Sequence, residues 1–267
     1  MKSESDCKIE IRDLTMAYGS FVVMRDINVR VSRGDIFIIM GGSGCGKSTL
    51  LRHMIGLKQP AQGDVYYDGA AFWQSDEEAR TEKLRRFGVL FQSGALWSSM
   101  TLSENIELVL EEYTGFPPAE LRGIARLKLA LVGLKGFEDY YPAEISGGMA
   151  KRAGLARALA LDPDVLFFDE PSAGLDPISS RNLDNLILEL RDTLGATFVI
   201  VTHELASIFT IGDTSIFLDP NTRTMRAHGN PRELLKNSTD PAVHQFLTRG
   251  ELSATANMVN PTSERAP

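Results

Sequence analysis

The residues whose types and spacing indicate chemistry begin with a glycine-rich run that ends in a lysine and a serine. The run fits the pattern G-x-x-x-x-G-K-[ST] and lies between an apolar stretch, 36–40, and a stretch of helical spacing. Backbone N–H groups of such a loop, the positive end of the following helix and a lysine ammonium together hold phosphate. We expect ATP to bind here, with Lys47 reaching the β and γ phosphates and Ser48 ligating Mg²⁺. The expected contacts are Gly41, Gly42, Ser43, Gly44, Cys45, Gly46, Lys47, Ser48 and Thr49.

A second group of chemically active side chains is a pair of carboxylates after an apolar run. Residues 165–168 are Val, Leu, Phe and Phe, and Asp169 and Glu170 follow them directly. Open α/β sheets bind ligands at the carboxyl ends of their strands, which places this pair beside the glycine-rich loop. We expect Asp169 to act on Mg²⁺ through a coordinated water and Glu170 to accept a proton from the water that attacks the γ-phosphate. The alternative is two solvated acids at an exposed strand end.

The elements that must position these groups follow from the periodicity of the apolar residues. Short apolar or alternating runs between turns predict strands, and runs of helical spacing predict helices. Strand patterns are absent from about 98 to 161, so a helical insertion interrupts them, and the alternation elsewhere predicts a parallel α/β sheet. The predicted strands are 9–14, 21–31, 36–40, 65–67, 89–91, 165–168, 198–201 and 216–218. The predicted helices are 50–56, 76–86, 119–134, 149–161 and 183–194.

Composition and charge exclude several classes of function. The 267 residues carry a formal net charge of -7, which argues against a nucleic acid partner. The first residues lack the basic and apolar segments of a secretory signal, and no apolar run approaches the ~20 residues that span a bilayer. We therefore expect the chain to stay in the cytoplasm and to reach a membrane only through a partner. In that compartment Cys7 and Cys45 are expected to be free thiols, and N–H donors and Lys47 around Cys45 favour its thiolate.

A third motif narrows the class of nucleotide hydrolase. Ser146, Gly147 and Gly148 stand just before a helical run and eighteen residues ahead of the paired carboxylates. In isolation, Ser-Gly-Gly would be an ordinary helix cap. In this order and company, Ile145 to Met149 resembles the signature motif of the ATP-binding-cassette (ABC) family, usually written LSGGQ, with Met149 in place of the glutamine. The resemblance spans roughly residues 8–245.

The resemblance implies roles for four further residues. Tyr18 matches the aromatic residue that stacks on adenine, although it could also be a core residue at a strand end. Gln92 matches the glutamine that senses Mg²⁺ and the attacking water and relays the nucleotide state to the helical insertion. Asp176, in Ser172 to Asp176, matches the loop that contacts the opposite subunit, and His203 matches the switch histidine that contacts the γ-phosphate.

The family also implies the architecture and the assembly. We expect a phosphate-loop (P-loop, RecA-like) α/β core with an N-terminal antiparallel β-subdomain, together about 1–92 and 162–250, and an inserted α-helical subdomain, about 93–161. Residues 251–267 have few bulky apolar groups and are expected to form a flexible tail. Two copies are expected to face head to tail, with each ATP between the phosphate loop of one copy and Ser146 to Gly148 of the other.

The expected partners lie in a membrane. Integral-membrane permease subunits would bind a groove beside Gln92 that includes Ala95, Leu96 and Trp97, although Trp97 could equally be core packing. Met149 to Arg152 and Phe91 to Leu96 are similar to the branch that serves MCE-type lipid transporters, which implies an MCE-domain substrate-binding protein. The chain would then sit on the cytoplasmic face of the inner membrane. A soluble ATPase of iron-sulfur cluster assembly remains the alternative, whereas a chromosome ATPase is disfavoured because the insertion is short and lacks heptads.

Overall fold

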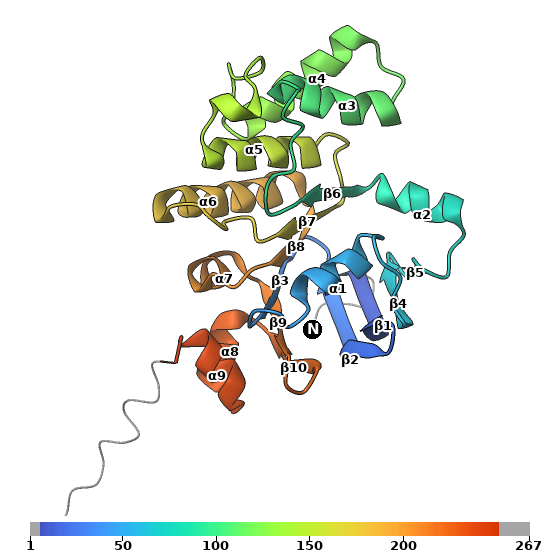
Figure 1. Ribbon diagram of the computed structural model, residues 1–267, viewed down its shortest axis with the longest axis vertical. Helices are drawn as coiled ribbons and strands as arrows, with labels where there is room; N and C mark the ends of the chain where they lie inside the picture. Colours follow the sequence, from blue (N-terminus) through green and yellow to red (C-terminus); the bar gives the residue numbers. More distant parts are fainter. Residues whose placement is uncertain (1–5, 251–267) are drawn as a thin grey trace, which may run out of the picture.

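The computed structural model describes residues 6–250, and its strands form two sheets (Figure 1). In the first sheet β1 pairs with β2 and with β4, and β4 pairs with β5, all antiparallel. Apolar residues of β1 alternate with polar ones, so one face of this sheet is buried and the other is solvated. The order is β2-β1-β4-β5, with β1 at Cys7–Tyr18, β2 at Phe21–Ser32, β4 at Gln62–Tyr67 and β5 at Ala70–Ala71.

The second sheet has six strands in the order β10-β9-β3-β8-β7-β6. Its strands are β3 (Ile36–Gly41), β6 (Phe87–Leu90), β7 (Val165–Asp169), β8 (Thr197–Val201), β9 (Thr214–Asp219) and β10 (Thr224–Gly229). Neighbouring strands from β9 to β6 are parallel, whereas β10 is antiparallel to β9. Because both faces of β3, β7 and β8 are covered, these strands are almost continuously buried and apolar.

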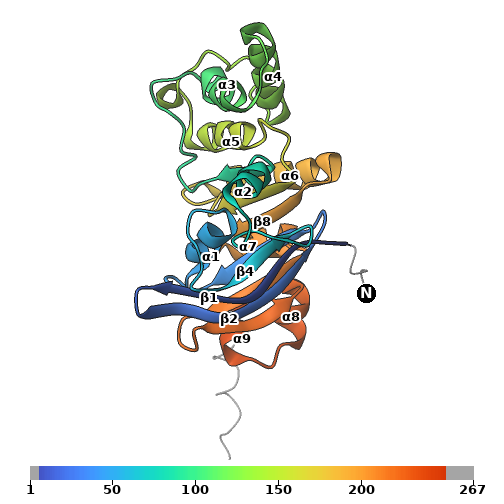
Figure 2. The same ribbon diagram turned by 90° about the vertical axis from the view of Figure 1, so that its right-hand side faces the viewer.

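Helices cover the second sheet and extend it at one end. Figures 1 and 2 show α3, α4 and α5 stacked as a lobe beyond β6, while α8 and α9 lie at the opposite end. The helices are α1 (Lys47–Met54), α2 (Glu77–Leu84), α3 (Leu102–Tyr113), α4 (Pro118–Leu131), α5 (Gly147–Ala158), α6 (Pro177–Leu194), α7 (Leu205–Ile211), α8 (Pro231–Asn237) and α9 (Pro241–Leu247).

Two apolar clusters hold these layers together. One joins the buried face of the antiparallel sheet to α1 and to the facing side of β3, β7, β8 and β9. The other joins the opposite side of the second sheet to α6 and to the helices α3, α4 and α5. Helix α1, which begins at Lys47, is therefore packed between the two sheets (Figure 2). Apolar contacts with both sheets therefore hold the start of α1 in position.

The predicted elements differ from the observed ones in several places. The sheet is mixed rather than wholly parallel, because β10 adds an antiparallel edge that its weakly patterned residues did not predict. Helix α3 was also not predicted, although Thr101 and Glu104 form a capping box at its start. The short helices α7, α8 and α9 were missed, since one or two turns carry too little periodicity. The predicted flexible tail, 251–267, lies outside the described residues.

Candidate functional site

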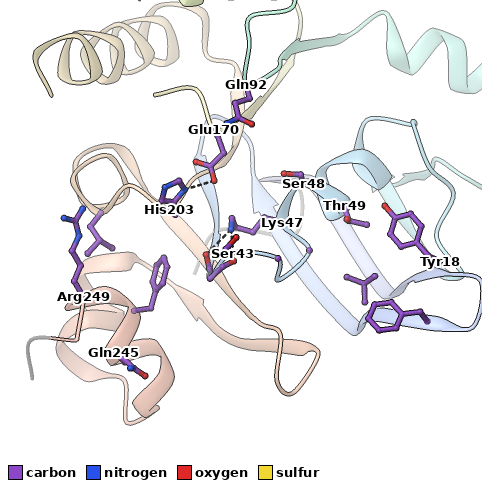
Figure 3. Close-up of a pocket in the computed structure, with 18 residues that line it drawn as sticks. Tyr18, Ser43, Lys47, Ser48, Thr49, Gln92, Glu170, His203, Gln245 and Arg249 are labelled. Atoms are coloured by element: carbon purple, nitrogen blue, oxygen red, sulfur yellow. Dashed lines mark hydrogen bonds and ion pairs between the residues drawn. The ribbon is translucent and has the colours of Figure 1, made fainter. Parts of the chain in front are cut away.

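A pocket of about 880 Å³ opens at the carboxyl ends of β3, β7 and β8 (Figure 3). It gathers residues that are far apart in the sequence, from the β1–β2 turn to the end of α9. This is the sheet edge at which open α/β folds bind ligands. The lining residues are Tyr18, Phe21, Val23, Gly41, Gly42, Ser43, Gly44, Gly46, Lys47, Ser48, Thr49, Gln92, Glu170, His203, Leu205, Gln245, Phe246 and Arg249.

The glycine-rich loop forms the floor of the pocket. Gly41 has φ 149°, and a Cβ added there would lie 2.5 Å from the Leu218 carbonyl oxygen, so only glycine fits. Lys47 folds back over the loop and donates from Nζ to the carbonyl oxygens of Gly41 and Gly42, at 3.0 and 2.9 Å. Its ammonium is thus mostly buried inside the loop, next to the amides that can receive phosphate.

Ser48 and Asp169 meet beside the loop. Ser48 Oγ donates to Asp169 Oδ1 over 2.9 Å, which joins the start of α1 to the end of β7. A hydroxyl and a carboxylate are hard oxygen ligands of the kind that Mg²⁺ accepts together with phosphate oxygens. Among the described residues no cluster of three His, Cys, Asp or Glu side chains could hold a metal by itself. Ser48 and Asp169 thus offer two oxygen atoms that could ligate a cation together with a nucleotide.

Glu170 and His203 form a second polar pair in the pocket wall. Glu170 Oε1 and His203 Nδ1 are 2.9 Å apart. A dashed line marks this contact in Figure 3. Glu170 has φ 50°, and its N–H donates to the Val201 carbonyl at 2.9 Å, which fixes the side chain at the sheet edge. Its Oε2 is buried and has no hydrogen-bond partner in the described chain. A buried carboxylate oxygen in this state is placed to accept a hydrogen bond from a ligand or water.

Tyr18 stands at the mouth of the pocket with 49% of its surface exposed, so it is not a core residue. Lys58 Nζ lies 2.8 Å from the centroid of its ring, a cation–π contact. The pKa of the Tyr18 phenol is lowered, chiefly by the hydrogen bond with Thr49 and further by Lys58 and Arg52. Gln92 follows β6 and lies at the upper wall near Glu170 in Figure 3.

Six of the residues expected at the nucleotide or its Mg²⁺ do not line this pocket: Cys45, Ser146, Gly147, Gly148, Asp169 and Asp176. Ser146 caps α5, and its Oγ accepts from the Met149 N–H at 3.3 Å. Asp176 caps α6 by accepting from two backbone N–H groups at 3.0 Å, and the Ser179 hydroxyl lowers its pKa. A Cβ placed on Gly148 would lie 3.7 Å from Ser179, so the two caps are neighbours on a separate surface.

The expectation that Cys45 favours its thiolate is wrong. Its side chain is 1% exposed and belongs to the apolar cluster around α1, so it does not line the pocket. Burial raises the pKa of this thiol, and this effect outweighs the opposing influence of Lys47. Cys45 therefore favours the neutral thiol and not the thiolate. Both Cys7 and Cys45 are free thiols, as expected.

Sequence reasoning missed several lining residues. Phe21 and Val23 belong to β2, and the turn between Tyr18 and Phe21 was the available signal for them. Gln245 and Phe246 belong to α9, and Arg249 follows that helix. All three are more than seventy positions beyond Glu170 in the sequence. No local pattern connects this end of the chain with the glycine-rich loop.

Comparison with known proteins identifies the family. A family model described as ABC transporter matches residues 24–173, more than half of the chain. The chain belongs to the ABC transporter family. The predicted P-loop α/β fold is also confirmed, because this ABC cassette superimposes on a solved dimeric, post-hydrolysis ATP-binding cassette bound to ADP and Pi. The TM-score is 0.73 at 29% identity, over 83% of this chain and 98% of that one.

Two curated relatives of this ABC cassette are similarly close. The intermembrane phospholipid transport system ATP-binding protein MlaF of Haemophilus influenzae is 40% identical over 243 residues, 91% of this chain and 90% of MlaF. The probable ribonucleotide transport ATP-binding protein mkl of Mycobacterium tuberculosis is 42% identical over 239 residues. That match covers 90% of this chain but 66% of mkl, so the chain spans about two thirds of that relative. In residues 6–250, no helix is both long and apolar enough to cross a bilayer.

Proposed function

We propose that this ABC cassette binds and hydrolyses Mg-ATP as part of a membrane transporter, and that two copies face head to tail around two nucleotides. One observation carries the proposal: every expected phosphate-loop residue except Cys45 lines a pocket, whereas Ser146 to Gly148 and Asp176 lie outside it. Ser146 is exposed at the start of α5, where its hydroxyl, which accepts from the Met149 N–H, can still donate to a phosphate at the helix N-terminus. A second copy would supply this surface to the pocket of the first.

Binding of the triphosphate would begin at the glycine-rich loop. The Lys47 ammonium, now held by two carbonyl oxygens, is placed to exchange them for β- and γ-phosphate oxygens. Ser48, Asp169 and Gln92 would hold Mg²⁺, which when bound neutralises charge on the β and γ phosphates. The adenine would stack on the exposed ring of Tyr18.

Proton transfer would fall to Glu170. Its Oε1 is engaged by His203, which leaves the buried Oε2 to accept a proton from the attacking water. The His203 ring, 56% exposed in the pocket, would hold the carboxylate in place and contact the γ-phosphate with its other nitrogen. In this arrangement Glu170 is the general base and His203 fixes its orientation.

We further propose that the transported molecules are phospholipids and that permease subunits hold the cassette on the cytoplasmic face of the inner membrane. The support is the likeness to MlaF, together with a groove of about 430 Å³ that a short permease helix would fit. Leu84, Val109 and Tyr113 line it, from α2 and α3. The residues expected in the docking groove, Ala95, Leu96 and Trp97, do not line this one, but Trp97 is 58% exposed and is therefore not a core residue. An MCE-domain protein would complete the system.

The ATPase proposal is tested with Lys47→Ala and Glu170→Gln in the purified complex. We expect Lys47→Ala to abolish hydrolysis, and Glu170→Gln to retain ATP binding while hydrolysis falls by roughly 10²- to 10⁴-fold, the usual contribution of a general base. Lys135→Ala and Glu112→Gln, both exposed outside the pocket, are the matched controls. Turnover within a few-fold of wild type in Lys47→Ala would disprove the site.

The transport proposal is tested by the proteins that co-purify from detergent-solubilised membranes. We expect a multi-span permease and an MCE-domain protein. Soluble scaffold proteins in their place would favour an ATPase of iron-sulfur cluster assembly and would contradict a transporter. The ATPase measurement is independent of this result.

A further inference from the structure

Two aromatic side chains, and not one, stand at the mouth of the pocket. Tyr18 and Phe21 are opposite residues of the β1–β2 pairing, separated only by a turn at Gly19, which has φ 58°. Directly opposite residues of an antiparallel pair project from the same face, so both rings extend toward the same side of the hairpin. Phe21 is 56% exposed and lines the pocket together with Tyr18.

Each of these rings carries a cation. Lys58 Nζ lies 2.8 Å from the Tyr18 centroid, and Arg223 Cζ lies 4.9 Å from the Phe21 centroid. The cations come from different places, the loop after α1 and the β9–β10 turn. Neither cation is among the residues that line the pocket.

The backbone holds Arg223 in place beneath Phe21. Arg223 has φ 55°, its N–H donates to the Asp219 carbonyl at 2.9 Å, and its own carbonyl accepts from the Arg25 N–H at 3.0 Å. The Asp219 carboxylate fixes the rest of the turn through the Asn221 N–H at 3.0 Å and Arg226 Nη1 at 2.9 Å. The β9–β10 turn is therefore docked on β2, and the side chain of Arg223 is presented to Phe21 by a rigid support.

We propose that Phe21 is a second base-binding residue of this site and that Arg223 is the positioning residue that holds its ring. Tyr18 would stack on one face of the adenine, and Phe21 would cover the face or edge that Tyr18 leaves exposed. Because both rings are held before any nucleotide arrives, little side-chain entropy is lost when the base binds. The inference rests on the proposed ATP function, since it assigns a further contact in the same pocket.

The test is equilibrium binding of ATP and of inorganic tripolyphosphate, both with Mg²⁺, to the full-length chain and its variants. We expect Phe21→Ala to weaken ATP binding about 5- to 30-fold, within the range of one base–aromatic stack, and to leave tripolyphosphate binding unchanged. Phe21→Tyr, which restores an aromatic ring, should return ATP affinity to within about twofold of wild type. Unaltered thermal unfolding would show that the variants remain folded.

Arg223 is tested by combining variants. Arg223→Gln should weaken ATP binding roughly two- to threefold in the wild-type background, as expected for loss of an exposed cation–π contact, and should have no effect in Phe21→Ala. An effect of the same size in both backgrounds would overturn the positioning role.

The results separate this inference from the function on which it rests. If Tyr18→Ala weakens ATP binding while Phe21→Ala does not, Phe21 is not a base contact, and the ATP site stands. Equal loss of ATP and tripolyphosphate in Phe21→Ala would also overturn the inference, because the residue would then support the pocket and not the base. A wild-type chain that binds neither compound would instead contradict the proposed function itself.

Discussion

Two surfaces are proposed to enclose ATP: the phosphate-loop pocket and the signature surface, Ser146 to Gly148 at the start of α5. They differ in how many of their polar groups are hydrogen-bonded within the chain. On the phosphate-loop side, Lys47, Ser48 and Glu170 each have a hydrogen-bond partner within the chain. On the signature side, Ser146 only caps its own helix, and a Cβ at Gly147 would meet nothing within 4 Å. The first surface is held by hydrogen bonds to residues of the core sheet and the glycine-rich loop, whereas the second is an exposed helix N-terminus. The difference is what a site completed by another copy of the chain requires.

The signature surface is nevertheless firmly tied to the pocket through α5. Lys151 donates from Nζ to the Gln92 carbonyl, and Arg157 donates to the carbonyls of Gly94 and Ala95 at 3.2 and 2.5 Å. Between them, a Cβ on Gly154 would lie 3.0 Å from the Gly94 oxygen, which marks a close backbone approach. These three positions lie at helical spacing on one face of α5. Helix α5 and the segment after Gln92 therefore form one unit.

The largest effect is expected from an experiment that tests whether each ATP site combines these two surfaces from different chains. Lys47→Ala and Ser146→Arg are placed either in different chains or in the same chain of a mixed dimer. If sites are shared, one lesion in each chain places both in a single site, and the dimer should still occlude one ATP. A doubly mutated chain paired with a wild-type chain has one lesion in each site and should occlude none. Occluded nucleotide is counted after rapid separation, since turnover can need both sites. The reverse outcome would show that each site lies within one chain.

A smaller effect is expected when the link between α5 and Gln92 is weakened. Burial lowers the pKa of Lys151, with the Glu170 carboxylate opposing this shift. Lys151→Met removes the hydrogen bond to Gln92 and should lower kcat on the order of tenfold by misplacing Gln92, with ATP affinity retained. Lys151→Arg should restore most of the rate in a steady-state ATPase assay. A rise in the Michaelis constant with no change in kcat would place Lys151 in binding and would contradict the linking role.

The smallest expected effect concerns α6, which presents Asp176 to solvent and Asp184 to the interior. Burial raises the pKa of Asp184 from 3.8 to about 6, against the effect of the Ser207 hydroxyl, which donates to it at 2.8 Å. The folded state then holds its proton more tightly than the unfolded state, so stability falls as pH rises between these values and the loss is complete above about 6.

Asp184→Asn should therefore stabilise the protein at neutral pH. The expected gain is about 2 kcal/mol, or roughly 4 to 8 °C in the unfolding temperature at pH 7.5, and it should shrink toward zero near pH 4. Differential scanning calorimetry at both values of pH measures it, with the exposed Glu189→Gln on the same helix as control. A gain that does not depend on pH would mean that packing, and not charge burial, governs Asp184.

The sequence predicted best what depends on neighbours in the chain. The strand, glycine loop and helix around Lys47 follow from a continuous stretch, and β7 with Asp169 and Glu170 follows from another. What failed depends on packing between distant segments. The Cys45 side chain is buried in the apolar cluster that contains α1 and strands of both sheets, and Arg249 reaches the pocket because α8 and α9 pack against the cluster on the other side of the second sheet. Neither arrangement is indicated by the spacing of apolar residues in the sequence.

The burial of Cys45 has a consequence for the chemistry of the thiol. Its Sγ would lie 2.7 Å from a Cβ on Gly41, directly under the floor of the pocket, and the raised pKa leaves little of the nucleophilic thiolate. A water-soluble disulfide reagent can therefore reach it only when the glycine-rich loop opens away from the core. The rate at which Cys45 is modified in the folded protein thus reports how often this loop opens, and a bound nucleotide that holds the loop closed would slow that rate.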